Sequence, residues 1–432
     1  MADFARSDSA AVQAQLDRLC MLSPGGDQLG LDRITRLLDR LGRPQDSLPP
    51  AFHVAGTNGK GSTCAFLRAG LEAAGHKVHV FTSPHLVRFN ERIRLAGTLI
   101  EDEAFAALLE DVLDVGADIQ PSFFEVATAA AFLAFARTPA DACIVEVGLG
   151  GRLDATNVID RPAVCGIAAL GVDHQQFLGS DPIVIAQEKA AIAKRGAPLV
   201  VSAYSDAILK AVAEIAEQKG APLYPAFSRW HFSPTDGRLN YRDSRGAMTV
   251  PLPILEGDHQ QENCALALAM LRHQDQVGVP LEAFERMPRE AHWPARLQKL
   301  AVGPLTELAG GDVWIDGGHN SNAAERIAIW LNRMPGPRPL LVIGLLANKD
   351  ARGFLERLGG TGCPMVAIPV ADHECHDPAQ LARLALELGF PAGAPAASLE
   401  AAISGASQSP VAILGSLYLA GEALKANRQY PD

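Results

Sequence analysis

One short segment combines glycines, a lysine and hydroxyl side chains between an apolar run and a helical stretch. It reads Phe-His-Val-Ala-Gly-Thr-Asn-Gly-Lys-Gly-Ser-Thr over residues 52–63. Glycines let backbone N–H groups close around phosphate oxygens, the start of a helix adds positive dipole, and Lys60 adds a point charge. Strict Walker spacing would require glycine at Val54, so the loop is a variant, and a plain glycine-rich turn is the structural alternative. The predicted phosphate site comprises Gly56, Thr57, Asn58, Gly59, Lys60, Gly61, Ser62 and Thr63, with the Ser62 hydroxyl near Mg²⁺.

Three further side chains could support a metal at this site. Glu146 ends an apolar run, where an ionised carboxylate needs a partner. Mg²⁺ is one such partner, and a hydrogen bond from a neighbouring loop is the alternative. His174 follows the run 164–167, a position where α/β sheets place ligand groups, although a lone histidine there is more often only a hydrogen-bonding residue. Lys189 lies in a strongly helical stretch, and composition alone favours a solvent-exposed lysine.

The elements that must position these residues follow an α/β pattern. Short β-branched runs alternate with Ala- and Leu-rich stretches, which predicts parallel strands flanked by helices. Predicted strands are 52–54, 78–81, 142–147, 164–167, 199–201, 313–315, 340–344, 365–368 and 411–414, and predicted helices include 31–41 and 65–74. Residues 224–253 are rich in Ser, Asp, Gly, Arg and Tyr and show little helical periodicity, which favours an antiparallel hairpin. Pro288 and Pro294 break any helix over 287–297, so the domain boundary is placed there.

Length, charge and cysteine content narrow the class of protein. The 432 residues favour two domains, and the net charge of -11 disfavours binding to nucleic acid or an anionic membrane. The seven cysteines form no CxxC pair, which fits a reducing cytoplasm. Residues 1–8 show no signal peptide, and no apolar run reaches the length of a membrane span. An anionic substrate would therefore require positive charge gathered locally.

Several sequence blocks resemble one known family. Residues 56–62 resemble the ATP loop of the Mur-ligase superfamily, and the Gly-Lys-Gly-Ser form resembles its dihydrofolate synthase/folylpolyglutamate synthase branch. The other matching blocks, in chain order, are 29–33, 82–86, 89–93, 123–125, 146–157, 173–174, 188–190, 316–320 and 415–419. The resemblance implies an N-terminal P-loop ATPase-type domain over 1–290, with a mostly parallel sheet flanked by helices. It also implies a smaller C-terminal Rossmann-like α/β domain over 291–432 that serves the glutamate ligase reaction.

The resemblance also implies roles for individual residues. Those implied in catalysis are Lys60, Lys189, Arg296 and His319. Those implied in nucleotide binding beyond the loop are Asn263, Arg296 and Asp316. Those implied to hold two Mg²⁺ ions are Ser62, Ser83, Glu146, His174 and a carbamylated Lys189. Those implied to bind substrate are Phe124, Asp154, Ala155, His319 and Ser416.

The implied reaction is ATP-dependent ligation of L-glutamate to dihydropteroate and to the γ-carboxylate of reduced folates, through an acyl phosphate. A monomer is the family expectation. Three alternatives stay open: a folylpolyglutamate synthase with a single activity, a cell-wall or poly-amino-acid ligase of the same superfamily, and a P-loop NTPase switch without ligase chemistry. The chain departs from the family pattern at Ala191, Gly318, Ser321 and Asn348.

Some residues keep two interpretations. Phe123 and Phe124 suit an apolar core better than the wall of a pterin site, although both are open. Arg92 and Arg94 are either anion contacts or surface arginines. The segment 372–377 is rich in metal-ligand types but lacks a known ligand spacing, so a polar loop is favoured.

Overall fold

The computed structural model describes residues 7–22, 29–404 and 409–431, and it forms two compact units. The first unit includes the described residues up to Ile254 together with Gln260–His292, and the second includes Leu255–His259 and Trp293–Pro431. The chain therefore crosses between the units three times, the last time at residues 292 and 293. The predicted absence of a signal peptide concerns residues 1–8, of which 1–6 lie outside the described residues.

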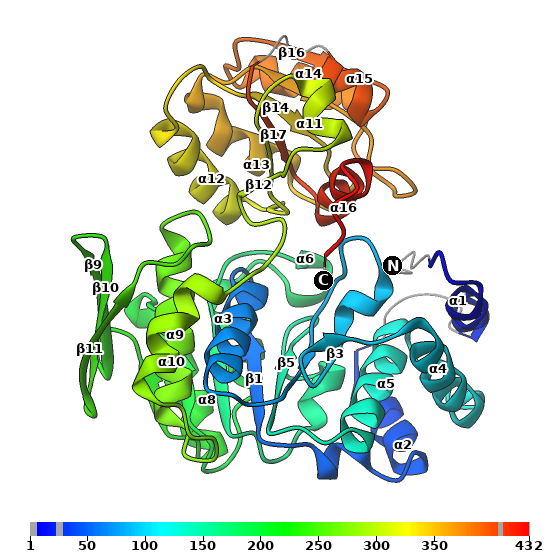
Figure 1. The fold of residues 1–432 in the computed structure, drawn as a ribbon, viewed down its shortest axis with the longest axis vertical. Coiled ribbons are helices and arrows are strands. Elements are labelled where there is room, and N and C mark those ends of the chain that lie inside the picture. The colour runs from blue at the N-terminus through cyan, green and yellow to red at the C-terminus, as the bar shows by residue number, and fades with distance from the viewer. Residues whose placement is uncertain (1–6, 23–28, 405–408, 432) are drawn as a thin grey trace. The chain divides into compact units, whose positions relative to one another are not determined.

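The first unit is built on an eight-stranded sheet in the order β4-β3-β2-β5-β1-β6-β7-β8 (Figure 1). The strands are β1 (Ala51–Ala55), β2 (Val78–Phe81), β3 (Ile93–Leu95), β4 (Thr98–Leu99), β5 (Ala142–Glu146), β6 (Val164–Ile167), β7 (Leu199–Val201) and β8 (Leu223–Pro225). Strands β2, β5, β1, β6, β7 and β8 run parallel, and β3 and β4 pair antiparallel at one edge. The predicted α/β class with a mostly parallel sheet is confirmed.

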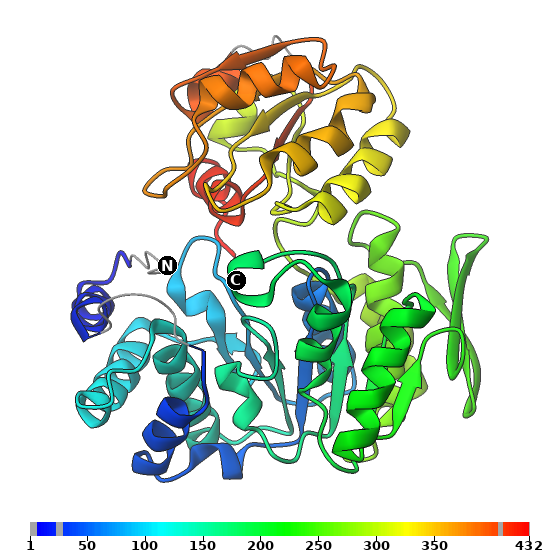
Figure 2. The ribbon, with the colours of Figure 1, turned by 180° about the vertical axis from the view of Figure 1, so that it is seen from behind.

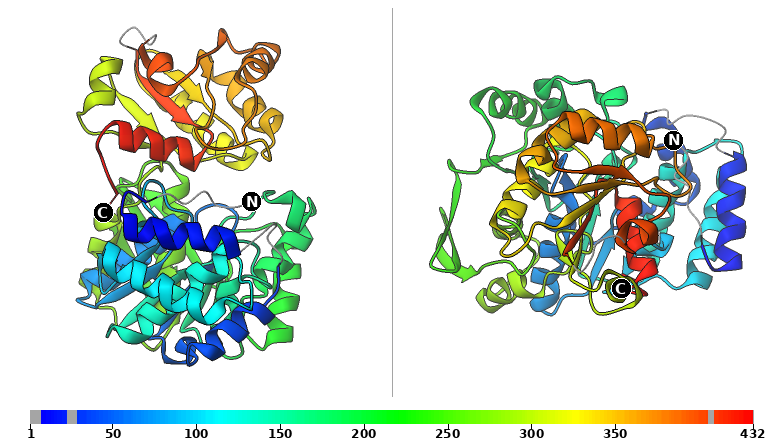
Figure 3. Two further views of the ribbon diagram at one scale, coloured as in Figure 1. Left: turned by 90° about the vertical axis from the view of Figure 1, so that its right-hand side faces the viewer. Right: turned by 90° about the horizontal axis from the view of Figure 1, so that it is seen from above.

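Helices cover both faces of this sheet, as the view from behind also shows (Figure 2). They are α1 (Ala10–Leu22), α2 (Asp32–Arg40), α3 (Lys60–Ala73), α4 (Asp102–Gly116), α5 (Phe123–Arg137), α6 (Gln175–Leu178), α7 (Pro182–Ala190), α8 (Asp206–Lys219), α9 (His259–His273) and α10 (Leu281–Glu290). Short 3-10 turns are η1 (Pro44–Ser47), η2 (Phe89–Arg92) and η3 (Ala155–Val158). Helix α1 packs against α4 (Figure 3), and α10 packs against α3.

Strand β1 lies in the middle of the sheet between β5 and β6, and all five of its residues are buried. Such a strand reads as an apolar run because helices cover both of its faces. One apolar cluster lies between the sheet and α4 and α5, and another gathers residues of β6, β7, α7 and α8. Strands β1, β5 and β6 are parallel, so the loops that follow them all leave from the carboxyl ends of the strands, where parallel sheets place ligand groups.

Residues 224–253 form three antiparallel strands rather than the single hairpin that the sequence predicts. Strands β9 (Trp230–Thr235), β10 (Arg238–Asp243) and β11 (Gly246–Pro251) pair in sequence order. Gly237 and Gly246, at the two tight turns, have φ of 73° and 115°. The prediction recognised the polar texture but missed the second turn, Ser244–Arg245.

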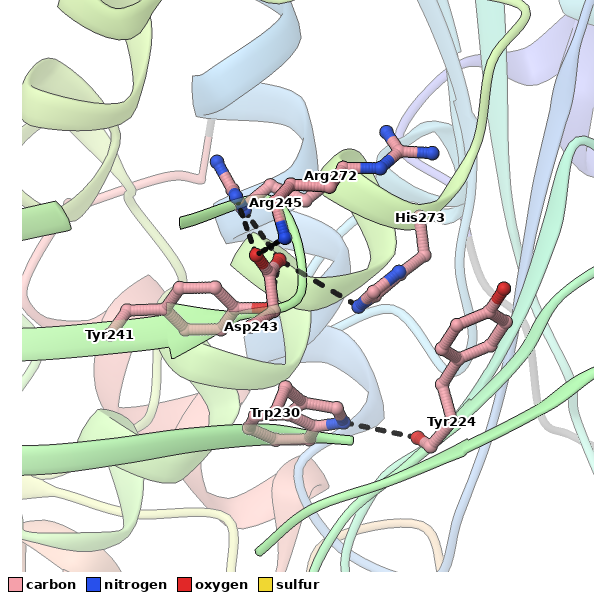
Figure 4. A network of polar contacts seen from close by, with 7 residues as sticks. All are labelled: Tyr224, Trp230, Tyr241, Asp243, Arg245, Arg272 and His273. Carbon is pink, nitrogen blue, oxygen red and sulfur yellow. Dashed lines mark hydrogen bonds and ion pairs between the residues drawn. The ribbon is translucent and has the colours of Figure 1, made fainter. Parts of the chain in front are cut away.

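A buried ion pair ties this three-stranded sheet to α9 (Figure 4). The Asp243 side chain is 0% exposed and accepts two hydrogen bonds of 2.6 Å from the Arg272 guanidinium. It also accepts from the Tyr241 hydroxyl at 3.1 Å and from the Arg245 N–H at 2.8 Å. The Tyr224 and His273 rings stack beside it, with centroids 4.2 Å apart. A bidentate arginine with further donors satisfies a carboxylate that burial would otherwise destabilise.

The second unit contains a six-stranded sheet in the order β12-β13-β17-β14-β15-β16. Its strands are β12 (Gln298–Lys299), β13 (Val313–Ile315), β14 (Leu340–Ile343), β15 (Met365–Ala367), β16 (Gly393–Pro395) and β17 (Val411–Leu414). Its helical segments are α11 (Pro304–Ala309), α12 (Ser321–Arg333), α13 (Ala351–Leu358), η4 (Gly359–Thr361), α14 (Pro378–Glu387), α15 (Leu399–Ser404) and α16 (Leu417–Ala426). All pairs except the edge strand β12 are parallel, so this unit is also α/β.

The prediction that Pro288 breaks a helix is wrong. Helix α10 contains Pro288 and continues to Glu290. Proline there removes only one backbone donor, close to the end of the helix, and its own carbonyl accepts from the Ile254 N–H at 2.9 Å. Among the described helices, none has both the length and the apolar character to cross a membrane.

Candidate active site

The loop between β1 and α3 is held by the loop that follows β6. The backbone N–H groups of Thr57 and Asn58 both donate to the Ala169 carbonyl, at 2.9 and 3.1 Å. The Thr57 hydroxyl and the Gly171 backbone bond each other at 2.9 and 3.1 Å. These amides are therefore committed to the protein, and the N–H groups of the first turn of α3 are the ones left for phosphate.

Gly59 shows why this loop needs glycine. Its φ is 83°, and a Cβ there would lie 2.3 Å from Oδ1 of Asn263. Asn263, the predicted nucleotide contact on α9, is 4% exposed and donates to the Gln260 side chain at 3.0 Å. The sequence-predicted residue therefore lies directly beside the phosphate loop.

Helix α3 begins at Lys60, five residues before the start of the predicted helix 65–74. The Lys60 ammonium donates to the Gly56 and Thr57 carbonyls at 3.2 and 3.4 Å and lies 4.0 Å from Oε1 of Glu146. Ser62 is 1% exposed, and its hydroxyl has no hydrogen-bond partner among the described residues. A buried hydroxyl without a protein partner suits a hard divalent cation.

Glu146 and Ser83 meet at the ends of β5 and β2. The Glu146 carboxylate is 4% exposed and accepts from the Ser83 N–H at 3.3 Å. The predicted metal residues Ser83 and Glu146 are thus brought together, and Lys60 joins them. Among the described residues, no group of three His, Cys, Asp or Glu side chains could hold a metal ion. A cation here would depend on hydroxyl and phosphate oxygens as well as on the carboxylate.

Lys189 is buried, and the composition-based expectation of a solvent-exposed lysine is wrong. It is 5% exposed, and its amine donates to the Gly56 carbonyl at 3.0 Å. Burial, followed by the neighbouring Lys60, lowers the pKa of the Lys189 amine to about 7. The amine therefore carries much less positive charge near neutral pH than an exposed lysine would.

One pocket joins the loops after β1, β5 and β6. Its lining residues are Gly56, Thr57, Lys60, Gly148, Leu149, Gly150, Asp173, His174, Leu178 and Lys189. His174, the predicted metal residue, occupies the N-cap position of α6 with φ of 52°, makes no side-chain capping bond and is exposed. The structure thus places His174 and Lys189 on the same pocket as the phosphate lysine.

The predicted substrate residues of the first unit lie beside this pocket. Phe124 packs so closely on Gly148 that a Cβ on the glycine would lie 2.4 Å from the ring. Phe123 is 9% exposed and belongs to the apolar core. Asp154 is 3% exposed and caps η3, accepting from Leu149 N–H at 2.8 Å and from Thr156 N–H at 3.0 Å. Ala155 is 5% exposed.

Arg92 is not a surface arginine. It is 2% exposed, donates to Nδ1 of His85 at 3.0 Å and lies over the Phe89 ring at 4.8 Å. Arg94 is half-buried and donates to the Gly97 carbonyl at 3.3 Å.

Two of the predicted residues of the second unit, Arg296 and His319, lie near a third, Asp316. The Asp316 carboxylate is 5% exposed and accepts from the N–H groups of Leu297 and Gly318, at 2.8 and 2.7 Å. Burial raises its pKa, and the nearby Arg296 and His319 oppose that shift. Arg296 donates to the Ala295 carbonyl at 2.8 Å, and Nδ1 of His319 lies 2.9 Å from the Gly317 carbonyl. Ser416 caps α16.

The segment 372–377 makes bonds within the protein. Asp377 caps α14, His376 bonds the Lys349 carbonyl at 2.9 Å, and His373 stacks on Tyr418 at 3.9 Å between ring centroids. These contacts are those of a polar loop.

Sequence reasoning missed the residues that support the site from behind. The Tyr204 hydroxyl lies 2.7 Å from both the Ile167 and Ala168 carbonyls, next to the backbone that holds the phosphate loop. His53 and Thr156 contact each other at 2.8 Å beneath Asp154. The polar His53 inside the apolar run of β1 was the one visible signal.

A glycine-rich loop follows the central strand, and a lysine and a carboxylate lie at the same carboxyl end of the sheet. These features define a nucleotide-binding α/β protein of the P-loop kind. Comparison with models of protein families found no match. Among curated proteins, the dihydrofolate synthase/folylpolyglutamate synthase of Escherichia coli (strain K12) is 37% identical over 336 residues, covering 76% of this chain and 75% of the relative. That of Bacillus subtilis (strain 168) is 36% identical over 349 residues, covering 77% and 79%.

Solved structures agree. The E. coli FolC structure in complex with DHPP and ADP has a TM-score of 0.87 and 32% identity, and the match covers 98% of both chains. A bifunctional folylpolyglutamate synthase/dihydrofolate synthase with Mn, AMPPNP and L-glutamate bound has a TM-score of 0.84 and 30% identity, with 97% of this chain and 99% of that chain covered. The chain belongs to the dihydrofolate synthase/folylpolyglutamate synthase family, a family of ATP-dependent ligases.

Proposed function

We propose that this protein joins L-glutamate to dihydropteroate and to the γ-carboxylate of reduced folates, using ATP. The observation that carries the proposal is the pocket in which Lys60 and Lys189 meet the phosphate loop, with Glu146 beside Lys60. Relatives that match nearly the whole chain were solved with ADP and DHPP, or with AMPPNP, Mn and L-glutamate. Those ligands are a nucleotide, a divalent cation and the two kinds of substrate that the reaction needs.

The first step activates the acceptor. Its carboxylate attacks the γ-phosphate of ATP, which yields ADP and an acyl phosphate. Lys60 and Arg296 offset the charge on the transferring phosphoryl group, and the first-turn N–H groups of α3 hold the other phosphate oxygens. We assign nucleotide contacts also to Asn263 and Asp316.

The second step forms the amide. The amine of L-glutamate attacks the acyl phosphate through a tetrahedral intermediate, and inorganic phosphate leaves. His319 and Ser416 hold glutamate, while Phe124, Asp154 and Ala155 border the acceptor. Residues 1–290 act as the ATP-binding domain and 291–432 as the glutamate-ligase domain, and the acyl phosphate must be shielded from water while glutamate binds.

Two Mg²⁺ ions belong to this proposal. Ser62, Ser83 and Glu146 would hold one ion, and His174 and Lys189 the other. When bound, Mg²⁺ neutralises charge on the phosphate oxygens. Lys189 would act as a carbamate, which forms when a neutral amine takes up CO₂ and releases a proton, and the pKa of about 7 makes neutral amine available.

Carbamylation is tested by mass. Intact protein measured under native conditions should carry additional mass equal to one CO₂, which disappears on acidification and is absent from the Lys189→Met variant. An unmodified Lys189 amine in a well-ordered crystal structure grown with bicarbonate would disprove the carbamate while leaving the ligase reaction standing.

The ligase reaction is tested by incorporation of labelled L-glutamate. Incorporation into dihydropteroate and, in a separate assay, into tetrahydrofolate should require ATP and Mg²⁺. Incorporation into tetrahydrofolate alone would reduce the function to a single-activity folylpolyglutamate synthase. No incorporation with either acceptor would reject the folate substrates and favour another Mur-type amino-acid ligase.

Phosphate release separates the ligase from an NTPase switch. The ligase should release phosphate at an appreciable rate only when both an acceptor and glutamate are present. Rapid hydrolysis without them would favour the switch.

Lys60→Ala should lower both activities by at least about a hundredfold, because a charge aimed at the transferring phosphoryl group is lost. The exposed Lys77 on the same unit provides the control, and Lys77→Ala should retain both activities. Full activity of Lys60→Ala would show that the phosphate loop is wrongly assigned.

We also propose that the protein is a monomer in a reducing cytoplasm. All seven cysteines are unpaired, and five of them are buried. Light scattering at working concentration tests the oligomeric state.

A further inference from the structure

Three buried polar side chains link the central strand to the pocket wall. His53 lies on β1, and Asp154 and Thr156 lie at the start of η3, with exposed fractions of 0%, 3% and 0%. Nε2 of His53 is 2.8 Å from the Thr156 hydroxyl, which donates to Oδ1 of Asp154 at 2.5 Å. Oδ2 of Asp154 accepts from the Leu149 N–H at 2.8 Å. Leu149 lines the pocket, so the bonds run from the core to the wall of the site.

The direction of each bond follows from the donor count. The Asp154 carboxylate accepts from the Leu149 N–H, the Thr156 N–H and the Thr156 hydroxyl, so both of its oxygens act as acceptors. A threonine hydroxyl has one proton, and here it goes to Asp154. Thr156 must then accept from His53, which places the imidazole proton on Nε2.

The other imidazole nitrogen agrees with this assignment. Nδ1 of His53 is buried and has no hydrogen-bond partner among the described residues. With the proton on Nε2, Nδ1 is a bare acceptor. The opposite tautomer would bury an N–H donor without a partner and would also set two lone pairs against each other at Thr156.

The backbone of the pocket wall is bonded to Asp154. Leu149 lies between Gly148 and Gly150, and the backbones of Gly148 and Leu149 both hydrogen-bond the Asp154 carboxylate. The Phe124 ring also packs on Gly148. Glycine backbones have wide conformational freedom, so these backbone bonds have a large share in fixing the position of the wall.

We propose that His53 and Thr156 are positioning residues: they orient the Asp154 carboxylate, which in turn fixes the 148–150 wall of the phosphate pocket. The consequence for catalysis rests on the ligase function proposed above, whereas the effect on the wall does not. A wall that moves would misplace the reacting groups and slow the chemical step more than it weakens nucleotide binding.

Hydrogen exchange at the Leu149 amide tests the effect on the wall. Thr156→Val keeps the shape of the side chain and removes the hydroxyl, and it should speed this exchange about tenfold. Thr156→Ser keeps the hydroxyl and should restore protection. His53→Leu should act like Thr156→Val, whereas His53→Gln retains an N–H donor and should lie closer to the wild type.

A buried histidine elsewhere in the same sheet provides the matched control. His79 on β2 is 0% exposed and bonds the Thr138 carbonyl at 2.9 Å, outside the pocket. His79→Leu should leave exchange at Leu149 unchanged even if it lowers the melting temperature.

Kinetics test the catalytic consequence. Thr156→Val should lower kcat by about tenfold or more while the KM for ATP changes less than about threefold, and Thr156→Ser should recover kcat. Unchanged Leu149 exchange in both Thr156→Val and His53→Leu would overturn the proposal. Faster exchange at Leu149 in His79→Leu as well would overturn it too, since general loosening would then explain the effect. If the wild type itself ligates no folate acceptor, while exchange behaves as expected, the proposed function fails and the positioning role stands.

Discussion

Single residues at this site combine burial with ionisable groups, and each does so in a different way. His53 is buried and neutral, and burial followed by the Lys194 charge lowers its pKa to about 3. Lys189 is buried with a pKa lowered to about 7. Burial raises the pKa of Asp154, and four hydrogen bonds to its carboxylate oppose this increase. Protonation of these groups is therefore coupled to folding.

His53 makes stability depend on pH in a defined direction. Its pKa is about 3 in the folded protein, against the ordinary histidine value of 6.5. Between these values the unfolded chain binds a proton that the folded protein does not, so stability falls as pH decreases from about 6.5 to about 3. His53→Gln should remove up to about 1.4 kcal/mol per pH unit of this dependence.

Urea unfolding at several pH values between 4 and 7 measures this slope. The exposed His292 serves as control, and His292→Gln should keep the wild-type slope. Identical slopes for His53→Gln and the wild type would show that His53 does not titrate differently in the two states.

The predicted phosphate loop rests on a local pattern, because its glycines, lysine and helix start are adjacent in the chain, and the structure has this segment between β1 and α3. The sequence predicted Lys189 wrongly from composition, although a signal existed. Ile185, Ala186, Lys189 and Ala190 are the buried residues of α7, and their spacing marks one face of a helix. The partners of Asp154 could not be predicted, because they depend on β1 and η3 meeting in three dimensions.

Among the strands and helices too, features set by local sequence were predicted better than features set by long-range contacts. Nine strands of the parallel sheets follow from apolar runs and were predicted closely, but the edge strands β8 and β16 were missed. The pairing order of β1 between β5 and β6 depends on long-range contacts that no local pattern contains. The three-stranded sheet β9–β11 depends on two turns and on an anchor, Asp243, whose partner Arg272 lies 29 residues away. The local sequence predicts one of the two turns and does not predict the Asp243–Arg272 ion pair.

Breaking the Asp243–Arg272 ion pair should destabilise the three-stranded sheet β9–β11 locally. Asp243→Asn keeps the shape, removes the charge and leaves Arg272, whose side chain is 13% exposed, without its ion-pair partner. We expect a loss on the order of 3 kcal/mol in stability. Hydrogen exchange should increase in residues 228–253 and at the end of α9, and much less in β1 and α3.

Asp236 provides the matched control. It is exposed in the β9–β10 turn with φ of 52°, a conformation that asparagine also adopts readily. Asp236→Asn should leave exchange unchanged. A uniform increase across the first unit in Asp243→Asn would argue against a local anchor.

At the scale of the whole molecule, an acidic chain must handle anionic substrates. The net charge is -11, while the groups assigned to ATP phosphates are Lys60 and Arg296, one in each unit. The phosphate loop lies entirely in the first unit, whereas Arg296 lies in the second. A mutation of Arg296 should therefore change the rate of phosphoryl transfer without a matching change in nucleotide affinity.

Arg296→Lys tests this division of roles. Lysine keeps the charge but loses the planar fork that suits a phosphoryl group. We expect kcat to fall about a hundredfold, with ADP affinity within about threefold of the wild type by calorimetry. Arg333, whose side chain is 65% exposed, is the control in the second unit, and Arg333→Lys should be neutral. A parallel loss of ADP affinity in Arg296→Lys would contradict the separation.

The course of the chain between the units has a consequence for its synthesis. The first unit is interrupted by Leu255–His259 and completed only by Gln260–His292. Asn263, which lies against Gly59, and α10, which packs against α3, both come from that late segment. A nascent chain that ends at residue 254 already contains the whole phosphate loop but lacks the contacts that α9 and α10 make with Gly59 and α3. Nucleotide capture should therefore begin only after α9 and α10 have left the ribosome.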